Sequence, residues 1–355
     1  MSKETRKKKD VKHVPSDIAL NVETQAPENP GVQDIASLLR DSFERITESA
    51  ERGNRVTGIS TGYERLDNAT GGLHPGELVL IASRPGMGKS SLALQIGINV
   101  ASPIAITDPS PNENTISAER HVPGYGVLVF SLEMAPKHIS VRAMCSEGRV
   151  NIGQLRQGRL LSDDWRRLTE AASYLASLPI WFDRVYDVAD IRSKVQKMQV
   201  EFNRPATGTT ANRKIGLVIV DPVQLLESYP RRQNREEEIA DATRALRRMA
   251  LDLDVAVIAT SQLNRSAETR VGRDKRPILT DLRESGALED AADAVLFVYR
   301  DEYYNPESTF LEGIAEIIIA KQRCGATCKI LTRFASSCGR FDNLAAGDYP
   351  NFDED

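Results

Sequence analysis

The stretch of sequence that decides the fold reads Ser83-Arg84-Pro85-Gly86-Met87-Gly88-Lys89-Ser90. An apolar run at residues 78–82 precedes it, and residues 91–96 follow with the apolar spacing of a helix. This order predicts a strand, a tight loop and a helix, in which the two glycines let backbone N–H groups turn inward. Such donors, together with a helix N-terminus, form a cradle for phosphate. The stretch therefore indicates nucleotide binding, the alternative being an ordinary glycine turn.

Lys89 and Ser90 are the side chains of this loop to which we assign chemistry. A lysine at this place reaches the β- and γ-phosphates, and the hydroxyl that follows it is a Mg²⁺ ligand. Ser83 stands where this type of loop has its first glycine, whereas Gly88-Lys89-Ser90 is intact. We therefore expect the quoted stretch, continued by Ser91, to bind a nucleoside triphosphate with Mg²⁺.

Length and composition bound the class of protein. The chain has 355 residues, of which 41% are hydrophobic, and a formal net charge of −4. The hydrophobic share suffices for a large core, and the net charge means that nucleic-acid contacts must come from local basic patches. No apolar run approaches the ~20 residues that span a bilayer, and the N-terminus lacks a signal-peptide core. We therefore expect a soluble cytoplasmic protein that makes no membrane contact.

The four cysteines are too few for a disulfide scaffold and indicate a reducing compartment. Cys324, Cys328 and Cys338 can be read as three zinc ligands. Their spacing fits no common zinc module, and no histidine lies near them. We therefore expect these three to be small buried thiols.

The chain begins with two regions outside the predicted core. Residues 1–30 are polar, basic in their first part and predicted to be disordered, either as a solvated tail or as a weak arm for a phosphate backbone. Residues 31–54 are predicted to be a linker helix and linker, because apolar residues recur there at helical spacing. Those residues are Ile35, Leu38, Leu39, Phe43 and Ile46. This apolar stripe must be buried, either on the chain's own core or on a neighbouring subunit.

Residues 55–343 read as one α/β domain, followed by an acidic tail at 344–355. Apolar runs alternate with helical segments, which predicts a mostly parallel sheet covered by helices on both faces. We expect strands at 78–82, 127–131, 180–182, 217–221, 255–261 and 294–299, helices at 136–147, 162–176, 188–201 and 235–251, and a closing hairpin at 314–320 and 329–334. Trp165, Leu168, Ala172 and Leu175 are predicted to share one face of the helix at 162–176. Residues 102–126 look like a surface insertion.

Three polar residues are predicted at carboxyl ends of strands, where ligands bind in parallel sheets. Asp221 ends a buried strand and is placed to hold the Mg²⁺ shell, although such an aspartate can also be a turn or cap residue. Glu133 can polarise a water for attack on the γ-phosphate or can cap the helix near Pro136. Gln262 can contact the γ-phosphate or the attacking water.

Two basic groups admit both a functional and a neutral interpretation. The segment 264–277, which contains Arg273, Lys275 and Arg276, is either a solvated loop or a loop that contacts phosphates. Lys321 and Arg323 follow an apolar strand and are either a surface pair or cations inserted into a neighbour's nucleotide site.

Seven motifs in order resemble the motor domain of DnaB-type replicative helicases over roughly residues 33–343. They are Ser83–Ser90, Ser131-Leu132-Glu133-Met134, Asp221-Pro222-Val223-Gln224-Leu225, Ser261-Gln262-Leu263-Asn264-Arg265, Lys275-Arg276-Pro277, Asp281-Leu282-Arg283-Glu284-Ser285-Gly286 and Lys321-Gln322-Arg323. The resemblance implies a RecA-like P-loop NTPase fold in a homo-hexameric ring. It also implies ATP hydrolysis at subunit interfaces and 5′→3′ movement on single-stranded DNA during replication.

The resemblance assigns a role to each matching residue. Lys89 and Ser90 become the phosphate and Mg²⁺ ligands, Asp221 the Walker B carboxylate, Glu133 the base and Gln262 the γ-phosphate sensor. Lys321 and Arg323 become fingers that act in trans. Arg283, Glu284 and Gly286 match a loop that touches the DNA backbone, and the helix at 33–51 matches a linker helix that docks on the adjacent subunit.

The sequence departs from the family in three places. The family's helical N-terminal domain has no counterpart here, which makes a primase contact doubtful, while a helicase loader is a further candidate partner. Pro222 replaces the family's usual tyrosine, and Cys324 and Cys328 alter the turn after Arg323. The alternatives to a helicase are a RecA-like recombinase, a clock-type ATPase ring, and a subunit that modulates another helicase's ring.

Overall fold

The chain forms two compact units, Met1–Thr57 and Gly58–Asp355, each taken by itself below. The computed structural model describes residues 34–40, 43, 47, 56–107, 119–122, 124–202, 214–227, 234–265, 268, 270, 274–307 and 310–345. The predicted basic tail at 1–30 and all but the first two residues of the predicted acidic tail lie outside these residues.

The first unit contains the predicted helix, which the structure describes at residues 35–40. Asp34 caps its start, because its carboxylate accepts the Ser37 N–H at 3.0 Å. This hydrogen bond also lowers the pKa of Asp34 below its ordinary value. The apolar side chains of the stripe are exposed, with Ile35 at 71% and Phe43 at 46%. The helical spacing is thus confirmed, and the described part of the stripe is not buried.

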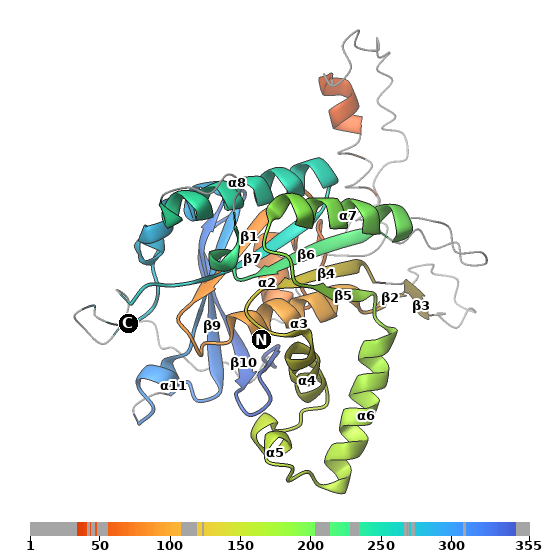
Figure 1. The fold of residues 1–355 in the computed structure, drawn as a ribbon, viewed down its shortest axis with the longest axis vertical. Coiled ribbons are helices and arrows are strands. Elements are labelled where there is room, and N and C mark those ends of the chain that lie inside the picture. The colour runs from red at the N-terminus through yellow and green to blue at the C-terminus, as the bar shows by residue number, and fades with distance from the viewer. Residues whose placement is uncertain are drawn as a thin grey trace, which may run out of the picture. The chain divides into compact units, whose positions relative to one another are not determined.

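The second unit is built on a nine-stranded sheet in the order β11-β10-β9-β8-β1-β7-β6-β4-β5 (Figure 1). The strands are β1 (Leu78–Ser83), β4 (Gly126–Ser131), β5 (Ile180–Asp183), β6 (Ile215–Asp221), β7 (Ala256–Gln262), β8 (Ala294–Tyr299), β9 (Ile314–Gln322), β10 (Cys328–Ala335) and β11 (Arg340–Asp342). Neighbours from β8 to β5 run parallel, whereas β8–β9, β9–β10 and β10–β11 are antiparallel. The predicted mostly parallel sheet and its closing hairpin are confirmed.

Helices cover both faces of this sheet, as predicted. Figure 1 shows α7 (Val188–Phe202) and α8 (Arg235–Leu253) on one side and α3 (Lys89–Ala101) on the other. Successive residues of β1 point to opposite faces. Val79 therefore packs in the cluster that contains Leu92 of α3, while Leu80 packs in the cluster that contains Leu246 of α8. Because both faces are buried, the strand reads as an unbroken apolar run.

Of the four residues predicted to share one face of α6 (Ser162–Ser177), Trp165 is 62% exposed. The buried stripe instead follows Asp164, Leu168 and Ala171, which lie at helical spacing. Asp164 is buried because its carboxylate accepts the Leu161 N–H at 2.9 Å and closes the first turn. Because Asp164 lies on the buried face of the helix, the ring of Trp165 at the next position points toward solvent.

Several short elements were not predicted. They are α2 (Glu64–Thr70), α5 (Ile152–Arg156), α10 (Gly286–Ala291), α11 (Asp301–Tyr304), the 3₁₀ turns η1 (Val223–Leu225) and η2 (Leu279–Ser285), and β11. The predicted helix α4 (Pro136–Glu147) has the predicted bounds. The insertion at 102–126 contains an antiparallel pair, β2 (Ile104–Thr107) and β3 (Glu119–Val122). Among the described helices, none has the length and apolar character to cross a membrane.

Candidate functional site

Four strand ends bring the predicted site residues to one edge of the sheet. In register, Ser83 of β1 lies beside Gln262 of β7, and Ser131 of β4 lies beside Asp221 of β6. Because these strands are parallel, their carboxyl ends open on the same side, as ligand sites of such sheets do. A cavity of about 690 Å³ lies there and is lined by Lys89, Asp221 and Gln262 among others. This volume lies within the range of small-molecule and cofactor sites.

The loop between β1 and α3 needs glycine at two positions. Gly86 and Gly88 have φ of +84° and +100°, the region that favours glycine. A Cβ on Gly88 would lie 2.9 Å from the Phe341 ring, so space also excludes a side chain there. Met87 between them is buried and anchors the turn in the core. The loop can therefore adopt this conformation, with its backbone open to a phosphate, only with glycine at both positions.

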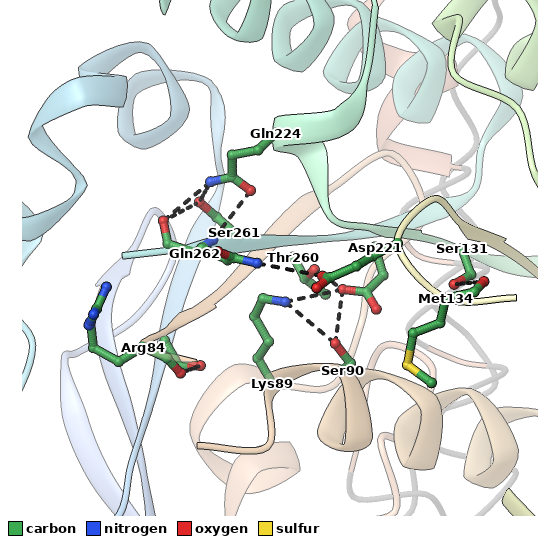
Figure 2. Close-up of polar contacts among 12 residues, drawn as sticks. Arg84, Lys89, Ser90, Ser131, Met134, Asp221, Gln224, Thr260, Ser261 and Gln262 are labelled. Atoms are coloured by element: carbon green, nitrogen blue, oxygen red, sulfur yellow. Dashed lines mark hydrogen bonds and ion pairs between the residues drawn. The ribbon is translucent and has the colours of Figure 1, made fainter. Parts of the chain in front are cut away.

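Lys89, Ser90 and Asp221 point toward one another at the start of α3 (Figure 2). The Lys89 ammonium lies 3.4 Å from Asp221 Oδ1, and the Ser90 hydroxyl donates to the same oxygen at 3.1 Å. Both Lys89 and Asp221 are buried, which strengthens their electrostatic interaction. Thr260, fully buried on β7, donates its hydroxyl to Asp221 Oδ1 as well. The hydroxyl and carboxylate oxygens fit the ligand preference of Mg²⁺.

Glu133 and Gln262 lie on the open side of this cluster. Gln262 Nε2 is 3.5 Å from Glu133 Oε2, the long limit of a hydrogen bond, and both residues are exposed. Glu133 does not cap α4, whose N-cap is Ala135 without a side-chain cap. The cap interpretation of Glu133 is therefore wrong.

Gln224 holds Gln262 in place, a role that the sequence analysis did not predict. Its side-chain amide donates to Ser261 Oγ at 2.6 Å and to the Gln262 carbonyl at 3.2 Å (Figure 2). Its Oε1 accepts the Gln262 N–H at 3.3 Å. The two-sided amide contact orients the end of β7.

Two arginines make contacts that were not predicted. Arg84 was assigned another role, and Arg300 was assigned none. Arg84 was predicted to bind nucleotide, but its side chain turns to the segment after β7, donating to the Leu263 carbonyl at 2.7 Å and to Glu268 at 2.8 Å. This ion pair lowers the pKa of Glu268. Arg300 follows β8, donates to the Gly86 carbonyl at 3.2 Å and lies 4.4 Å from the centre of the Phe334 ring. No motif at Arg300 marked it, because Gly86 and Phe334 are far away in sequence, although Arg300 also pairs with the nearby Glu302.

The predicted DNA-contacting residues have different outcomes. Arg273 lies outside the described residues, and so do the side chains of Arg283 and Glu284, while Gly286 begins α10. The Arg276 guanidinium is held by both oxygens of Glu316, at 2.7 and 2.6 Å, and Glu316 is 1% exposed. This pairing raises the pKa of Arg276. A guanidinium so committed is not free for phosphate, so the assignment of Arg276 is corrected to a structural ion pair; the Lys275 ammonium contacts the Arg270 carbonyl.

Lys321 and Arg323 lie at the other end of the sheet from the cavity. Gln322 pairs with Ala294 at the start of β8, and the Arg323 N–H donates to the Asp293 carbonyl at 2.9 Å. Lys321 contacts the Glu289 carbonyl, and Arg323 is half exposed. Neither cation is brought to Lys89 of its own chain.

The cysteine prediction is wrong for two residues. Cys338 is buried as expected, and Cys145 is buried too, but Cys324 and Cys328 are exposed in and beside the β9–β10 turn. A tight hairpin turn projects its residues into solvent, which apolar spacing does not reveal. Within the described part of the chain, no group of three or more metal-ligating His, Cys, Asp or Glu side chains was found.

Known proteins match this chain over most of its length. The DnaB-like helicase C terminal domain family matches residues 58–343. The replicative DNA helicase DnaB of Geobacillus stearothermophilus is 36% identical over 324 residues, which make up 90% of this chain and 64% of that protein. A solved ATPase domain is 33% identical with a TM-score of 0.74, covering 88% of this chain and 100% of the other.

A second solved structure, of a DnaB-like replicative helicase and its interactions with primase, is 33% identical with a TM-score of 0.71 and covers 88% of this chain and 68% of that one. The chain thus spans about 64% of the length of the curated relative. The RecA-like fold that the sequence resemblance implied is confirmed. Because the family model matches residues 58–343, well over half of the chain, the chain belongs to the DnaB-like helicase C-terminal domain family.

Proposed function

We propose that this chain is an ATP-dependent DNA helicase that forms a homo-hexameric ring and moves 5′→3′ on single-stranded DNA in replication. Membership of the DnaB-like family supports the motor and its place in replication. One observation carries the ring: the phosphate site and the cations that would complete it stand at opposite ends of the same sheet.

The length of β1 separates the phosphate loop from Arg323. Asp293, whose carbonyl binds the Arg323 N–H, also pairs with Leu78 at the start of β1, whereas the phosphate loop follows Ser83 at its end. A strand of this length spans roughly 17–20 Å at about 3.3 Å per residue. Arg323 therefore has no route to Lys89 in its own chain. A second copy that presents its amino-end face to the cavity supplies the missing charge.

The residues of the cavity divide the chemistry among them. Lys89 binds the β- and γ-phosphates, Ser90 and Asp221 hold Mg²⁺, and the loop from Ser83 to Ser91 encloses the phosphates. When bound, Mg²⁺ neutralises charge on the phosphate oxygens. Glu133 accepts a proton from the attacking water, and Gln262 contacts the γ-phosphate and senses its loss. Lys321 and Arg323 of a neighbour stabilise the charge of the transition state.

DNA and protein partners extend the proposal. Arg283, Glu284 and Gly286, with Arg273 and Lys275, are the proposed contacts to the DNA backbone. The exposed helix at 35–40 is proposed to dock on the adjacent copy. A helicase loader is a further proposed partner, and the protein is proposed to act in the cytoplasm.

The test combines assembly, hydrolysis and unwinding. Native mass with an ATP analogue and single-stranded DNA is expected to show six copies, and DNA is expected to stimulate ATP hydrolysis. Forks with a 5′ tail are expected to be unwound, and forks with only a 3′ tail are not. Glu133→Gln should bind ATP without hydrolysing it. Three results would overturn the proposal. The first is full ATP hydrolysis by a monomer that DNA does not stimulate. The others are strand exchange without unwinding, and activity only within the ring of another helicase.

A further inference from the structure

The buried carboxylate of Asp293 joins two functional parts of the molecule. It is 5% exposed and lies just before β8. Its Oδ2 accepts the Leu78 N–H at 2.8 Å, at the start of β1. Its Oδ1 lies 2.9 Å from Arg247 Nη2 and 3.3 Å from Arg323 Nε. One side chain thus touches the strand that leads to the phosphate loop and the cation proposed to serve a neighbour.

The backbone around Asp293 repeats the same link. The Asp293 N–H donates to the Leu78 carbonyl, and the Arg323 N–H donates to the Asp293 carbonyl, both at 2.9 Å. Arg323 Nη2 makes a long contact of 3.4 Å with the Asp290 carbonyl, and its side chain is 52% exposed. The guanidinium is therefore held at Nε by the Asp293 carboxylate and at Nη2 by the Asp290 carbonyl, and about half of the side chain remains exposed. Charge-assisted contacts of this kind restrict a long side chain to few orientations.

We propose that Asp293 is a positioning residue that aims Arg323 into the neighbouring copy's nucleotide site and fixes it to β1. This inference rests on the proposed function, in which Arg323 acts in trans. β1 is buried along its whole length and ends at the phosphate loop, and Asp293 joins the start of this strand to Arg323.

Asp293→Asn tests the aim of the finger with little change of shape. The amide keeps an oxygen for the Leu78 N–H but turns an NH₂ group toward the two arginines. We expect hydrolysis to fall about 10- to 100-fold, the cost of a misplaced catalytic group. Nucleotide binding should stay within about twofold, and adding Asp293→Asn to Arg323→Ala should cause no further loss.

Asp164→Asn is the matched control. Asp164 is also buried, with one oxygen on Arg167 Nη2 at 2.6 Å and the other on the Leu161 N–H at 2.9 Å, but it lies on α6. We expect it to leave hydrolysis per folded chain unchanged. Loss of nucleotide binding in Asp293→Asn would mean a structural role and would overturn the inference.

Mixed assemblies separate the inference from the proposed function. Arg323→Ala chains mixed with Lys89→Ala chains should regain hydrolysis, because the latter lend intact fingers; if they do not, the action in trans fails. Asp293→Asn chains mixed with Lys89→Ala chains should regain hydrolysis in the same way. Two results would overturn the inference alone, provided that the mixture of Arg323→Ala and Lys89→Ala chains recovers hydrolysis. In the first, Asp293→Asn is fully active by itself. In the second, Asp293→Asn is impaired and Lys89→Ala chains do not rescue it.

Discussion

The two ends of β1 carry different chemistry. At the carboxyl end, side chains from four strands and α3 converge on one cavity and contact each other, as Lys89, Ser90 and Thr260 do around Asp221. At the amino end, the cations Lys321 and Arg323 are held by backbone carbonyls and by Asp293, and Arg323 extends into solvent. The carboxyl end thus carries a cluster formed within one chain, whereas the amino end carries a cation that is proposed to act in a neighbouring copy.

This difference shows why a complete set of motifs does not make a complete site. Under the proposed function, each chain contains every residue that the reaction requires, but the sheet holds them a strand length apart. Hydrolysis is then expected to depend on contact between copies, and the following experiments test this dependence.

The largest expected effect comes from removing a cation at each end. Lys89→Ala should abolish hydrolysis and weaken ATP binding, because a buried charge on the phosphates is lost. Arg323→Ala should lower hydrolysis by about 10³-fold or more while binding persists, since its role is confined to the transition state. Phosphate release and fluorescent-nucleotide binding measure the two quantities.

Lys137→Ala on α4 and Arg333→Ala on β10 are the controls, because both replace exposed cations away from the two proposed roles. Each should hydrolyse ATP at the parent rate. Equal loss of binding in Lys89→Ala and Arg323→Ala would erase the distinction between the ends.

A smaller effect is expected from Gln224→Glu at the carboxyl end. The carboxylate keeps an acceptor for the Gln262 N–H but places an oxygen against the Gln262 carbonyl, which now receives a donor at 3.2 Å. We expect about tenfold slower hydrolysis, with KM for ATP unchanged. Gln199→Ala is the control, because it removes a side-chain hydrogen bond from α7 to the Leu253 carbonyl of α8 and none at the site. A raised KM with an unchanged kcat would argue against orientation of Gln262.

Gly88→Ala tests the loop by stability rather than activity. We expect a loss of about 2–4 kcal/mol, since the residue has φ of +100° and its Cβ would press on Phe341 at 2.9 Å. Gly158→Ala has the same kind of φ, +69°, but nothing within 4 Å, and should cost only about 1–2 kcal/mol. Thermal unfolding compares the two. Equal costs would show that Phe341 yields and that backbone conformation alone demands glycine.

The smallest effect concerns His74 before the amino end of β1. Its ring lies 3.3 Å from Glu77, and this hydrogen bond raises the pKa of His74 above its ordinary value of 6.5. The folded state thus favours the charged ring, so the contribution is complete below pH 6.5 and is lost as pH rises through the folded-state pKa. Both groups are about a third exposed, so we expect less than about 1 kcal/mol. Glu77→Gln should lower Tm more at pH 6 than at pH 8, and a constant difference would contradict this.

Much of the fold was predictable because its signals are local. The strands are apolar runs, the phosphate loop is contiguous, and the rule for parallel strands places Asp221 and Gln262 beside Lys89. The helix from Pro136 to Glu147 could be bounded because proline starts it and Gly148 follows it.

What could not be predicted depends on partners far apart in the chain. Arg276 looks like a phosphate contact until Glu316, 40 positions away, is seen to hold it. The contact of Asp293 with Leu78 spans 215 positions. Trp165 fits an apolar stripe, but a buried polar cap at Asp164 decides the rotation of the helix. Periodicity records which residues are apolar and not which polar residues are satisfied inside.

The described residues Glu268, Arg270 and Arg276 each form an ion pair with a different part of the domain. Their partners are Arg84 in the phosphate loop, Asp281 in η2 and Glu316 in β9. Loss of any one of these ion pairs therefore leaves the segment joined to the domain through the other two.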